Sequence, residues 1–114
     1  MKNFVLFFRM DITTPGAQPS PEQMQEYRTQ WMTWVNSISD KGQLEGGNHL
    51  SPQGRVLQHQ EQIETPYISE SNSVAGYLLI SAKDLEEATQ IAKACPILNG
   101  QTTSVEIREI ATPG

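Results

Sequence analysis

Two helical patterns, each set between strand-like segments, constrain the fold of this chain more than any other feature. The first begins at residues 20–23, where Ser20 can cap a helix, Pro21 suits the first turn and Gln23 can complete a capping box. Gly42 is the expected end of this helix. Apolar residues recur between them at helical spacing on one face: Met24, Tyr27, Trp31, Trp34, Val35 and Ile38.

The second helical pattern begins within residues 81–84 and ends before Pro96, because the residue before a proline is disfavoured in a helix. Its expected apolar face comprises Leu85, Ala88, Ile91, Ala92 and Cys95. Extended segments are predicted at residues 2–10, 43–50, 55–60, 62–65, 74–81 and 104–110. The segment 2–10 is continuously apolar at its centre, which favours a central strand buried on both faces. Residues 11–19 and 99–101 are expected to be a loop and a turn.

The order of these elements predicts an α+β fold. Strand, helix, strand, hairpin, strand, helix, strand is a ferredoxin-like βαββαβ plan with an extra β-hairpin, built on an antiparallel sheet. The 114 residues fit a single domain, residues 1–114. Both helices would cover one face of the sheet, so the other face needs polar residues or a second copy of the chain to cover it. We therefore expect a homodimer.

Charge and composition exclude several classes of function. Thirteen acidic residues against eight basic ones give a net charge of −5 with no basic cluster, so nucleic acid is not an expected partner. The longest apolar run, residues 4–8, is far shorter than the roughly 20 residues that span a membrane. It also does not have the pattern of a signal peptide. A cytoplasmic location is therefore expected. With one Cys and two His, neither a structural metal site nor a cofactor is predicted.

Seven short segments carry a resemblance to a known family. They are MQEY (24–27), WMTW (31–34), GGNHLSP (46–52), AGY (75–77), DLEEA (84–88), CPIL (95–98) and VEIR (105–108). In this order and spacing, the chain resembles the YCII-related, or DGPF-domain, proteins over essentially its whole length. The resemblance implies a dimeric α/β barrel with a cleft near the helix and the dimer seam. It also implies either dehydrochlorinase-like chemistry on a chlorinated ring product, as in one branch, or an association with sigma factors.

The sequence departs from this family at the residues that would perform catalysis. Many relatives carry His where this chain has Tyr27, and the motif Asp-Gly-Pro-Phe matches residues 64–67, which begin with Glu64. An imidazole and a carboxylate meeting in a cleft would form an acid/base pair. Here the imidazole is missing, and tyrosine, with a pKa of about 10, is a poor base at neutral pH. The family's His/Asp pair is therefore not intact, which argues against inherited catalysis.

Six residues are the candidates for a ligand site. Tyr27, Trp31 and Glu64 would line the cleft, His49 would lie at its rim beside the Gly46-Gly47 pair, Tyr67 would shape the loop near Glu64, and Arg9 could bind an anion. Each also has a purely structural interpretation. Tyr27 and Trp31 can simply pack in the core, Glu64 and His49 can be exposed, and Arg9 can pair with Glu106.

Other residues with reactive side chains are expected to be inert. Register counting puts His49 and His59 on opposite faces, which argues against a two-histidine metal site. Cys95 is expected to be a small buried hydrophobe.

Three functions remain open on the sequence. The first is a homodimer that binds a small molecule near the dimer seam. The second is a lyase or isomerase acting on a small ring compound, with Glu64 as base and Tyr27 as proton donor. The third is a regulatory or scaffolding dimer associated with transcription control, which needs no small-molecule ligand.

Overall fold

The computed structural model of the protein describes residues 1–13, 20–100 and 102–111. Part of the predicted loop at 11–19, and Gln101 of the predicted turn at 99–101, lie outside these ranges. The elements are β1 (Lys2–Asp11), α1 (Pro21–Asp40), β2 (Leu44–His49), β3 (Val56–Gln58), β4 (Glu61–Ile63), β5 (Asn72–Ala82), α2 (Leu85–Lys93), the short 3₁₀ helix η1 (Pro96–Asn99) and β6 (Ser104–Glu109).

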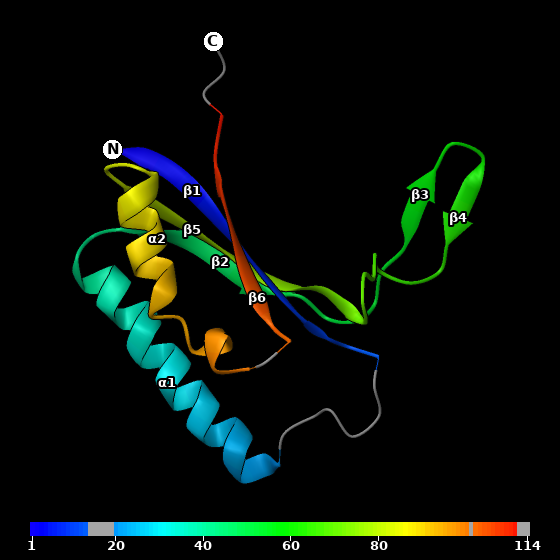
Figure 1. Cartoon of the computed structure of the whole chain (residues 1–114), viewed down its shortest axis with the longest axis horizontal. Helices are drawn as coiled ribbons and strands as arrows, with labels where there is room; N and C mark the ends of the chain where they lie inside the picture. The colour runs from blue at the N-terminus through cyan, green and yellow to red at the C-terminus, as the bar shows by residue number, and fades with distance from the viewer. Residues whose placement is uncertain (14–19, 101, 112–114) are drawn as a thin grey trace.

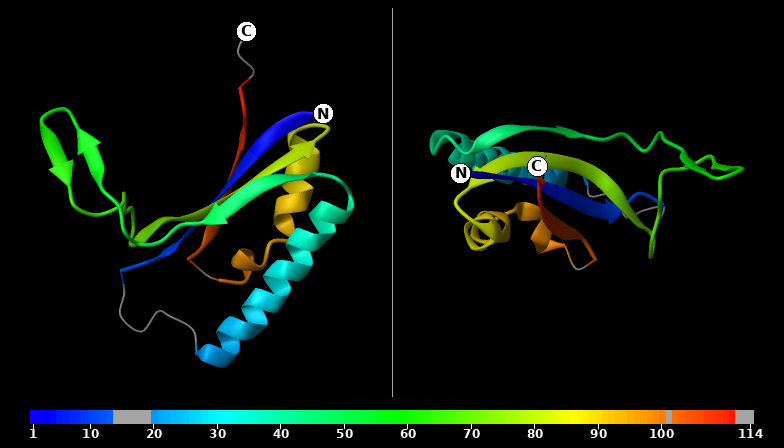
Figure 2. Two further views of the ribbon diagram at one scale, coloured as in Figure 1. Left: turned by 180° about the vertical axis from the view of Figure 1, so that it is seen from behind. Right: turned by 90° about the horizontal axis from the view of Figure 1, so that it is seen from above.

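Four strands form one antiparallel sheet in the order β2-β5-β1-β6, and both helices lie on one side of it (Figure 1). The predicted ferredoxin-like plan is confirmed. Strands β3 and β4 pair with each other as a separate hairpin, which projects from one end of the sheet (Figure 2). The hairpin inserted between β2 and β5 is thus present where the sequence predicts it.

The core lies between the sheet and the helices. Alternate residues of β1 and β5 point into it, as expected for strands with one face toward helices. Its buried apolar members are Phe4, Leu6, Phe8, Trp34, Ile38, Leu78, Ile80, Ala82, Ala88, Ala92, Cys95 and Ile97. On the opposite face, Val5 and Phe7 of β1 are half-buried. In the single chain, β1 is therefore buried on the face toward the helices, as predicted, but only half-buried on the other face.

Helix α1 begins and ends at the predicted residues. The Ser20 Oγ accepts a hydrogen bond from the Gln23 N–H at 3.2 Å, and the Gln23 Oε1 accepts one from the Ser20 N–H at 3.0 Å. This reciprocal pair is the predicted capping box. Gly42 follows the last turn with a φ of 70° and donates its N–H to the Ser39 carbonyl at 2.9 Å. Glycine adopts this backbone region with little steric cost.

The second helix differs from its prediction at both ends. Leu85, expected on the apolar face, is 54% exposed. It is the first residue of α2, and helical side chains tilt toward the N-terminus, so its side chain points past the start of the helix into solvent. Cys95 is buried as predicted but lies outside α2. Pro96 holds Cys95 in an extended conformation, and the chain then forms η1, which the sequence pattern did not indicate.

Strand β5 begins earlier than predicted because a tight turn leads into it. Ser69 and Asn72 exchange backbone hydrogen bonds of 2.8 and 2.9 Å, which closes a two-residue turn. Its two central residues, Glu70 and Ser71, have φ angles of 53° and 68°. Turns with two positive φ angles match the twist of a hairpin, but they usually contain Asn or Gly. The position of this turn extends β5 back to Asn72.

Candidate functional site

Helix α1 and strand β2 form the two walls of a cleft with a volume of about 290 Å³. Trp31 and Val35 lie on the helical wall, and His49 lies on the strand wall. The floor comes from the sheet behind them. The remaining lining residues are Phe8, Met32, Leu44, Gly46, Gly47, Asn48, Tyr77 and Leu78. The cleft therefore combines an apolar interior with polar groups at one end.

Trp31 is the best-supported side chain of the cleft. Its ring meets Phe8 edge to face, with centroids 4.9 Å apart, and meets Trp34 in the same manner at 5.3 Å. Trp34 is itself fixed, because its Nε1–H donates a 3.0 Å hydrogen bond to the Ile91 carbonyl. The side of Trp31 toward β2 faces the imidazole of His49, at a centroid distance of 5.6 Å. Two buried rings thus hold the indole in place beside the cleft.

The glycines of β2 make the cleft possible. The pairing with β5 shifts register between Leu44 and Gly46, which marks a β-bulge or irregularity in β2. A Cβ atom added to Gly47 would lie 2.6 Å from the Tyr77 carbonyl oxygen and 2.7 Å from Leu78 Cδ1, so only glycine fits there. A Cβ atom on Gly46 would meet only Leu79 Cδ1, at 3.9 Å. The strand therefore runs close to β5 and leaves its wall free of side chains at this point.

Few polar groups reach the cleft. The exposed His49 imidazole reaches it beside Trp31. The Asn48 amide donates a 3.0 Å hydrogen bond to the Tyr77 hydroxyl on the opposite face of the sheet, because Asn48 is in register with Tyr77 and Tyr77 with Phe7. Within the described part of the chain, no carboxylate, lysine or arginine lines this cleft. Such a site suits a small neutral or weakly polar ring that needs one or two hydrogen bonds for its orientation.

Tyr27 lies one helical turn before Trp31, outside the residues that line the cleft. Its ring centroid is 6.0 Å from that of Trp31, and the side chain is half-buried. Burial, with a smaller contribution from the nearby Cys95 thiol, raises the pKa of Tyr27 to about 12. The phenol is therefore neutral at physiological pH, and the raised pKa also makes it a weaker proton donor than an ordinary tyrosine. Its structural interpretation, as a support for Trp31, accounts for this position.

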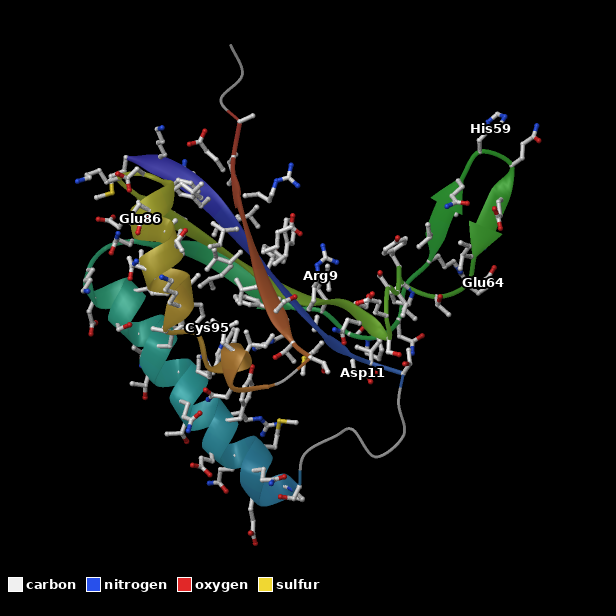
Figure 3. The ribbon with its side chains drawn as sticks, viewed as in Figure 1. Arg9, Asp11, His59, Glu64, Glu86 and Cys95 are labelled. Carbon is white, nitrogen blue, oxygen red and sulfur yellow. The ribbon has the colours of Figure 1, made fainter. Side chains whose placement is uncertain are left out.

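Glu64 lies with the projecting hairpin rather than with α1 (Figure 3), and Tyr67 follows it in the segment between β4 and β5. The Glu64 carboxylate is exposed and bonds to Arg55 Nε at 2.8 Å and to Gln62 Nε2 at 2.7 Å. Tyr67 is 66% exposed. Within one chain, the structure does not bring Glu64 together with Tyr27, and neither residue lines the cleft. The proposed Glu64 base and Tyr27 donor thus occupy separate parts of the protomer.

The structure also locates the residues that were expected to be inert. His59 lies at the tip of the hairpin (Figure 3), away from His49 in β2. No group of three His, Cys, Asp or Glu side chains that could hold a metal ion occurs among the described residues. Burial raises the pKa of Cys95 to about 12, so its thiol is a weak nucleophile.

Arg9 is paired on the sheet face opposite the helices. Its Nη2 lies 2.9 Å from Glu106 Oε1. This ion pair is the structural interpretation of Arg9 that the sequence suggests. A hydrogen bond from Arg9, reinforced by Arg108, holds the pKa of the Glu106 carboxyl below its usual range.

Sequence reasoning missed several cleft residues. Phe8 and Leu78 were expected only in the sheet, and Asn48 and Tyr77 fall within the family-like segments 46–52 and 75–77 without a role assigned to them. The alternation of β1 already places Phe8 on the helix-facing side, so that signal was available. The end of the sheet that stays uncovered depends on where α1 crosses the sheet. The hydrophobic periodicity of the sequence does not predict that position.

Known proteins resemble this chain in sequence and in structure. A solved structure of the 5-chloro-2-hydroxyhydroquinone dehydrochlorinase TftG from Burkholderia phenoliruptrix AC1100, in complex with 2,5-dihydroxybenzoquinone, is similar at 15% identity, over 91% of this chain and 90% of that chain, with a TM-score of 0.49. No curated protein matches the sequence. In the described residues, no helix has the length and apolar character needed to cross a membrane. The YCII-related domain matches residues 5–111, and the chain therefore belongs to the YCII-related family.

Proposed function

We propose that this YCII-related protein is a homodimer that binds a small planar ring compound in the cleft between α1 and β2. The observation that carries the proposal is the position of Trp31, held by Phe8 and Trp34 with its free side on the cleft. Fixed aromatic surfaces bind flat rings well because little side-chain entropy is lost on binding. His49 supplies the polar contact that would orient the ring.

The size of the cleft limits the ligand. Its volume of about 290 Å³ lies at the lower end of the range for small-molecule sites, which runs from roughly 300 to 1,000 Å³. A single substituted ring fits such a volume better than a nucleotide or a cofactor. The absence of charged groups among its described lining residues disfavours a ligand that carries several charges there.

The uncovered sheet face supports the dimer. Val5, Phe7, Tyr77 and Leu79 lie on the side of the sheet away from the helices, and each is half-buried in the single chain. Apolar groups on a two-layer fold are normally covered, and packing two such faces together would cover both at once. We also expect the protein to act in the cytoplasm, where the Cys95 thiol stays reduced.

Nuclear magnetic resonance can test the ligand site directly. The chain has two tryptophans, and their indole N–H signals report on different surroundings. Titration with hydroquinone, a flat ring that is neutral at pH 7, is expected to shift the Trp31 signal strongly and the Trp34 signal weakly, since the Trp34 N–H is occupied by the Ile91 carbonyl. cis-1,4-Cyclohexanediol, which has a similar size but no flat ring, is expected to shift neither.

Substitutions then identify the surface that binds. Trp31→Ala is expected to weaken binding by about tenfold, the loss of one aromatic contact. Tyr67→Ala removes an exposed aromatic ring outside the cleft and serves as the matched control, with unchanged affinity. Equal losses in both variants, or binding of the cyclohexanediol with the same affinity, would contradict the proposal.

A second candidate function is a lyase or isomerase acting on a small ring compound, and the observation in its favour is His49. It lines the cleft, and histidine is the side chain that most often acts as a general acid or base in enzymes. In elimination of HCl from a chlorinated ring, His49 would take the proton while chloride leaves. Chloride release from a chlorinated hydroxyhydroquinone should fall at least about a hundredfold in His49→Gln and remain unchanged in Glu64→Gln. Equal rates in wild type and His49→Gln would eliminate this candidate.

A further inference from the structure

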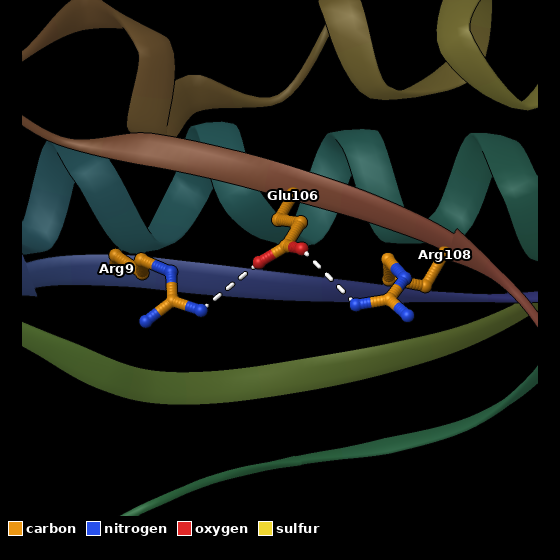
Figure 4. Close-up of polar contacts among 3 residues, drawn as sticks. All are labelled: Arg9, Glu106 and Arg108. Carbon is orange, nitrogen blue, oxygen red and sulfur yellow. Dashed lines mark hydrogen bonds and ion pairs between the residues drawn. The ribbon is translucent and has the colours of Figure 1, made fainter. Parts of the chain in front are cut away.

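The sheet face turned away from the helices holds a cluster of three charged side chains, Arg9, Glu106 and Arg108 (Figure 4). Glu106 Oε1 lies 2.9 Å from Arg9 Nη2, and Glu106 Oε2 lies 3.5 Å from Arg108 Nη1. One carboxylate therefore serves two guanidinium groups. The cluster has an excess of one positive charge, although the whole chain carries a net charge of −5.

The two guanidinium groups keep donors that Glu106 does not use. A guanidinium offers several N–H groups in a planar fork that matches a carboxylate. In residues 1–13, 20–100 and 102–111, Glu106 is the ion-pair partner found for each of the two arginines, and each pairs with it through a single nitrogen. The Arg9 side chain is 34% exposed and that of Arg108 is 68% exposed, so both can reach an incoming anion.

An apolar surface lies between the two arginines. Phe7 is in register with Glu106 on one side and with Tyr77 on the other, and Val5 is in register with Arg108. Because Arg9, Phe7 and Val5 alternate along β1, all three point to the same face. Positive groups beside an apolar floor fit a molecule with a carboxylate at one end and a hydrocarbon part at the other.

We propose that Arg9 and Arg108 form a binding site for a small free organic carboxylate on this sheet face, separate from the cleft beside Trp31. The carboxylate bonds to the guanidinium N–H groups that Glu106 leaves free, and the hydrocarbon part covers Phe7. The site lies within one chain and does not depend on the ring-binding cleft. In the homodimer proposed above, a second copy would cover this sheet face, where unpaired positive charge is costly and an anion would offset it.

Titration calorimetry with sodium benzoate tests this site in the full chain at low ionic strength. Arg9→Gln and Arg108→Gln are each expected to weaken benzoate binding by about tenfold, through loss of a charge-assisted hydrogen bond. Arg55→Gln is the matched control, because Arg55 is also exposed and ion-paired but lies beside the hairpin with Glu64. Its affinity for benzoate should equal that of the wild type. Glu106→Gln removes the competing negative charge and should tighten binding severalfold.

Several results would overturn the proposal. These are the absence of benzoate binding at millimolar concentration, an equal loss in Arg55→Gln, or weaker binding in Glu106→Gln. Benzoate that shifts the Trp31 indole signal equally in wild type and Arg9→Gln would show binding in the cleft instead. Light scattering distinguishes a site for a free anion from one filled by a carboxylate of the second copy. If the mass of the protein in solution is the same with and without benzoate, the result supports the site. A fall in mass would show that a partner carboxylate fills the site, and would overturn it.

Discussion

Trp31 of α1 and His49 of β2 face each other across the cleft with ring centroids 5.6 Å apart and planes inclined by 43°. A flat ring held between two parallel rings needs a separation of about 7 Å, two van der Waals contacts of about 3.5 Å each. A ligand in this cleft therefore stacks on Trp31 and meets His49 from the side, or displaces the imidazole. The strand wall next to them lacks side chains at the Gly46-Gly47 pair, which leaves room for the first arrangement.

The two glycines of β2 should respond differently to the same substitution. Both have φ angles near 155°, so an alanine pays a similar backbone cost at each position. Gly47→Ala also forces its Cβ against the Tyr77 carbonyl and should lower the free energy of unfolding by about 2–4 kcal/mol, whereas Gly46→Ala should cost about 1 kcal/mol. Urea unfolding of the two variants measures the difference. Similar losses would mean that the close approach of β2 to β5 is not present in solution.

The tight turn before β5 should accept a stabilising substitution. Ser71 has a φ of 68°, a region that costs a residue with a Cβ atom about 1 kcal/mol and costs glycine little. Ser71→Gly is therefore expected to raise the free energy of unfolding by about 0.5–1 kcal/mol. Ser69→Gly, in the same turn but outside that region, should lower it. Thermal unfolding distinguishes the two, and a destabilised Ser71→Gly would rule out the two-residue turn.

The uncovered sheet face should control assembly. Leu79→Glu places a negative charge on this face, next to the apolar side chain of Val5 on the neighbouring strand. If two sheets pack face to face, burying this charge is costly, and light scattering should report the mass of one chain, 12.7 kDa, in place of twice that value. Leu57→Glu, at a residue of the hairpin that is 73% exposed, should leave the mass unchanged. A wild-type protein with the mass of one chain would contradict the dimer itself.

Alkaline pH should destabilise the protein through two buried groups. Folding raises the pKa of Cys95 from 9.0 to about 12 and that of Tyr27 from 10.0 to about 12. The unfolded chain therefore loses these protons first, and the stabilisation is complete below pH 9 and lost as the pH rises toward 12. We expect a loss of about 2 kcal/mol or more between these limits.

Isosteric variants check the source of this loss. Tyr27→Phe should flatten the decline in unfolding free energy between pH 10 and 12, because it removes one of the two titrating groups. Tyr67→Phe is the matched control, since the Tyr67 ring is 66% exposed. A decline of the same steepness in wild type, Tyr27→Phe and Tyr67→Phe would assign the effect to other groups.

Local sequence patterns predicted the elements well, and distant contacts poorly. The capping box of Ser20 and Gln23 depends on residues three positions apart, so the sequence contains all the information needed for it. The pairing of Trp31 with His49 joins a helix and an edge strand, and it follows from the angle at which α1 crosses the sheet. No periodicity encodes that angle.

Glu64 shows the same limit at the hairpin. Its alignment with a family motif placed it in the cleft, but the hairpin is joined to the sheet by residues 50–55 and 64–71, which lie outside the helices and strands, so no periodicity indicates its direction. In the projecting hairpin, the partners of Glu64 are Arg55 and Gln62. Cys95 illustrates the opposite case, since a buried small side chain follows from its apolar neighbours without any knowledge of topology.

The bulge in β2 has a consequence beyond the cleft, because β2 forms one edge of the sheet. A straight edge strand offers a regular row of N–H and C=O groups to which another molecule's strand can add, and this is a common route to aggregation. The shift between Leu44 and Gly46 interrupts that row. The opposite edge, β6, carries Glu106, Arg108 and Glu109, whose charges resist such pairing. The glycine pair that shapes the cleft thus also helps to keep concentrated protein from polymerising through its edges.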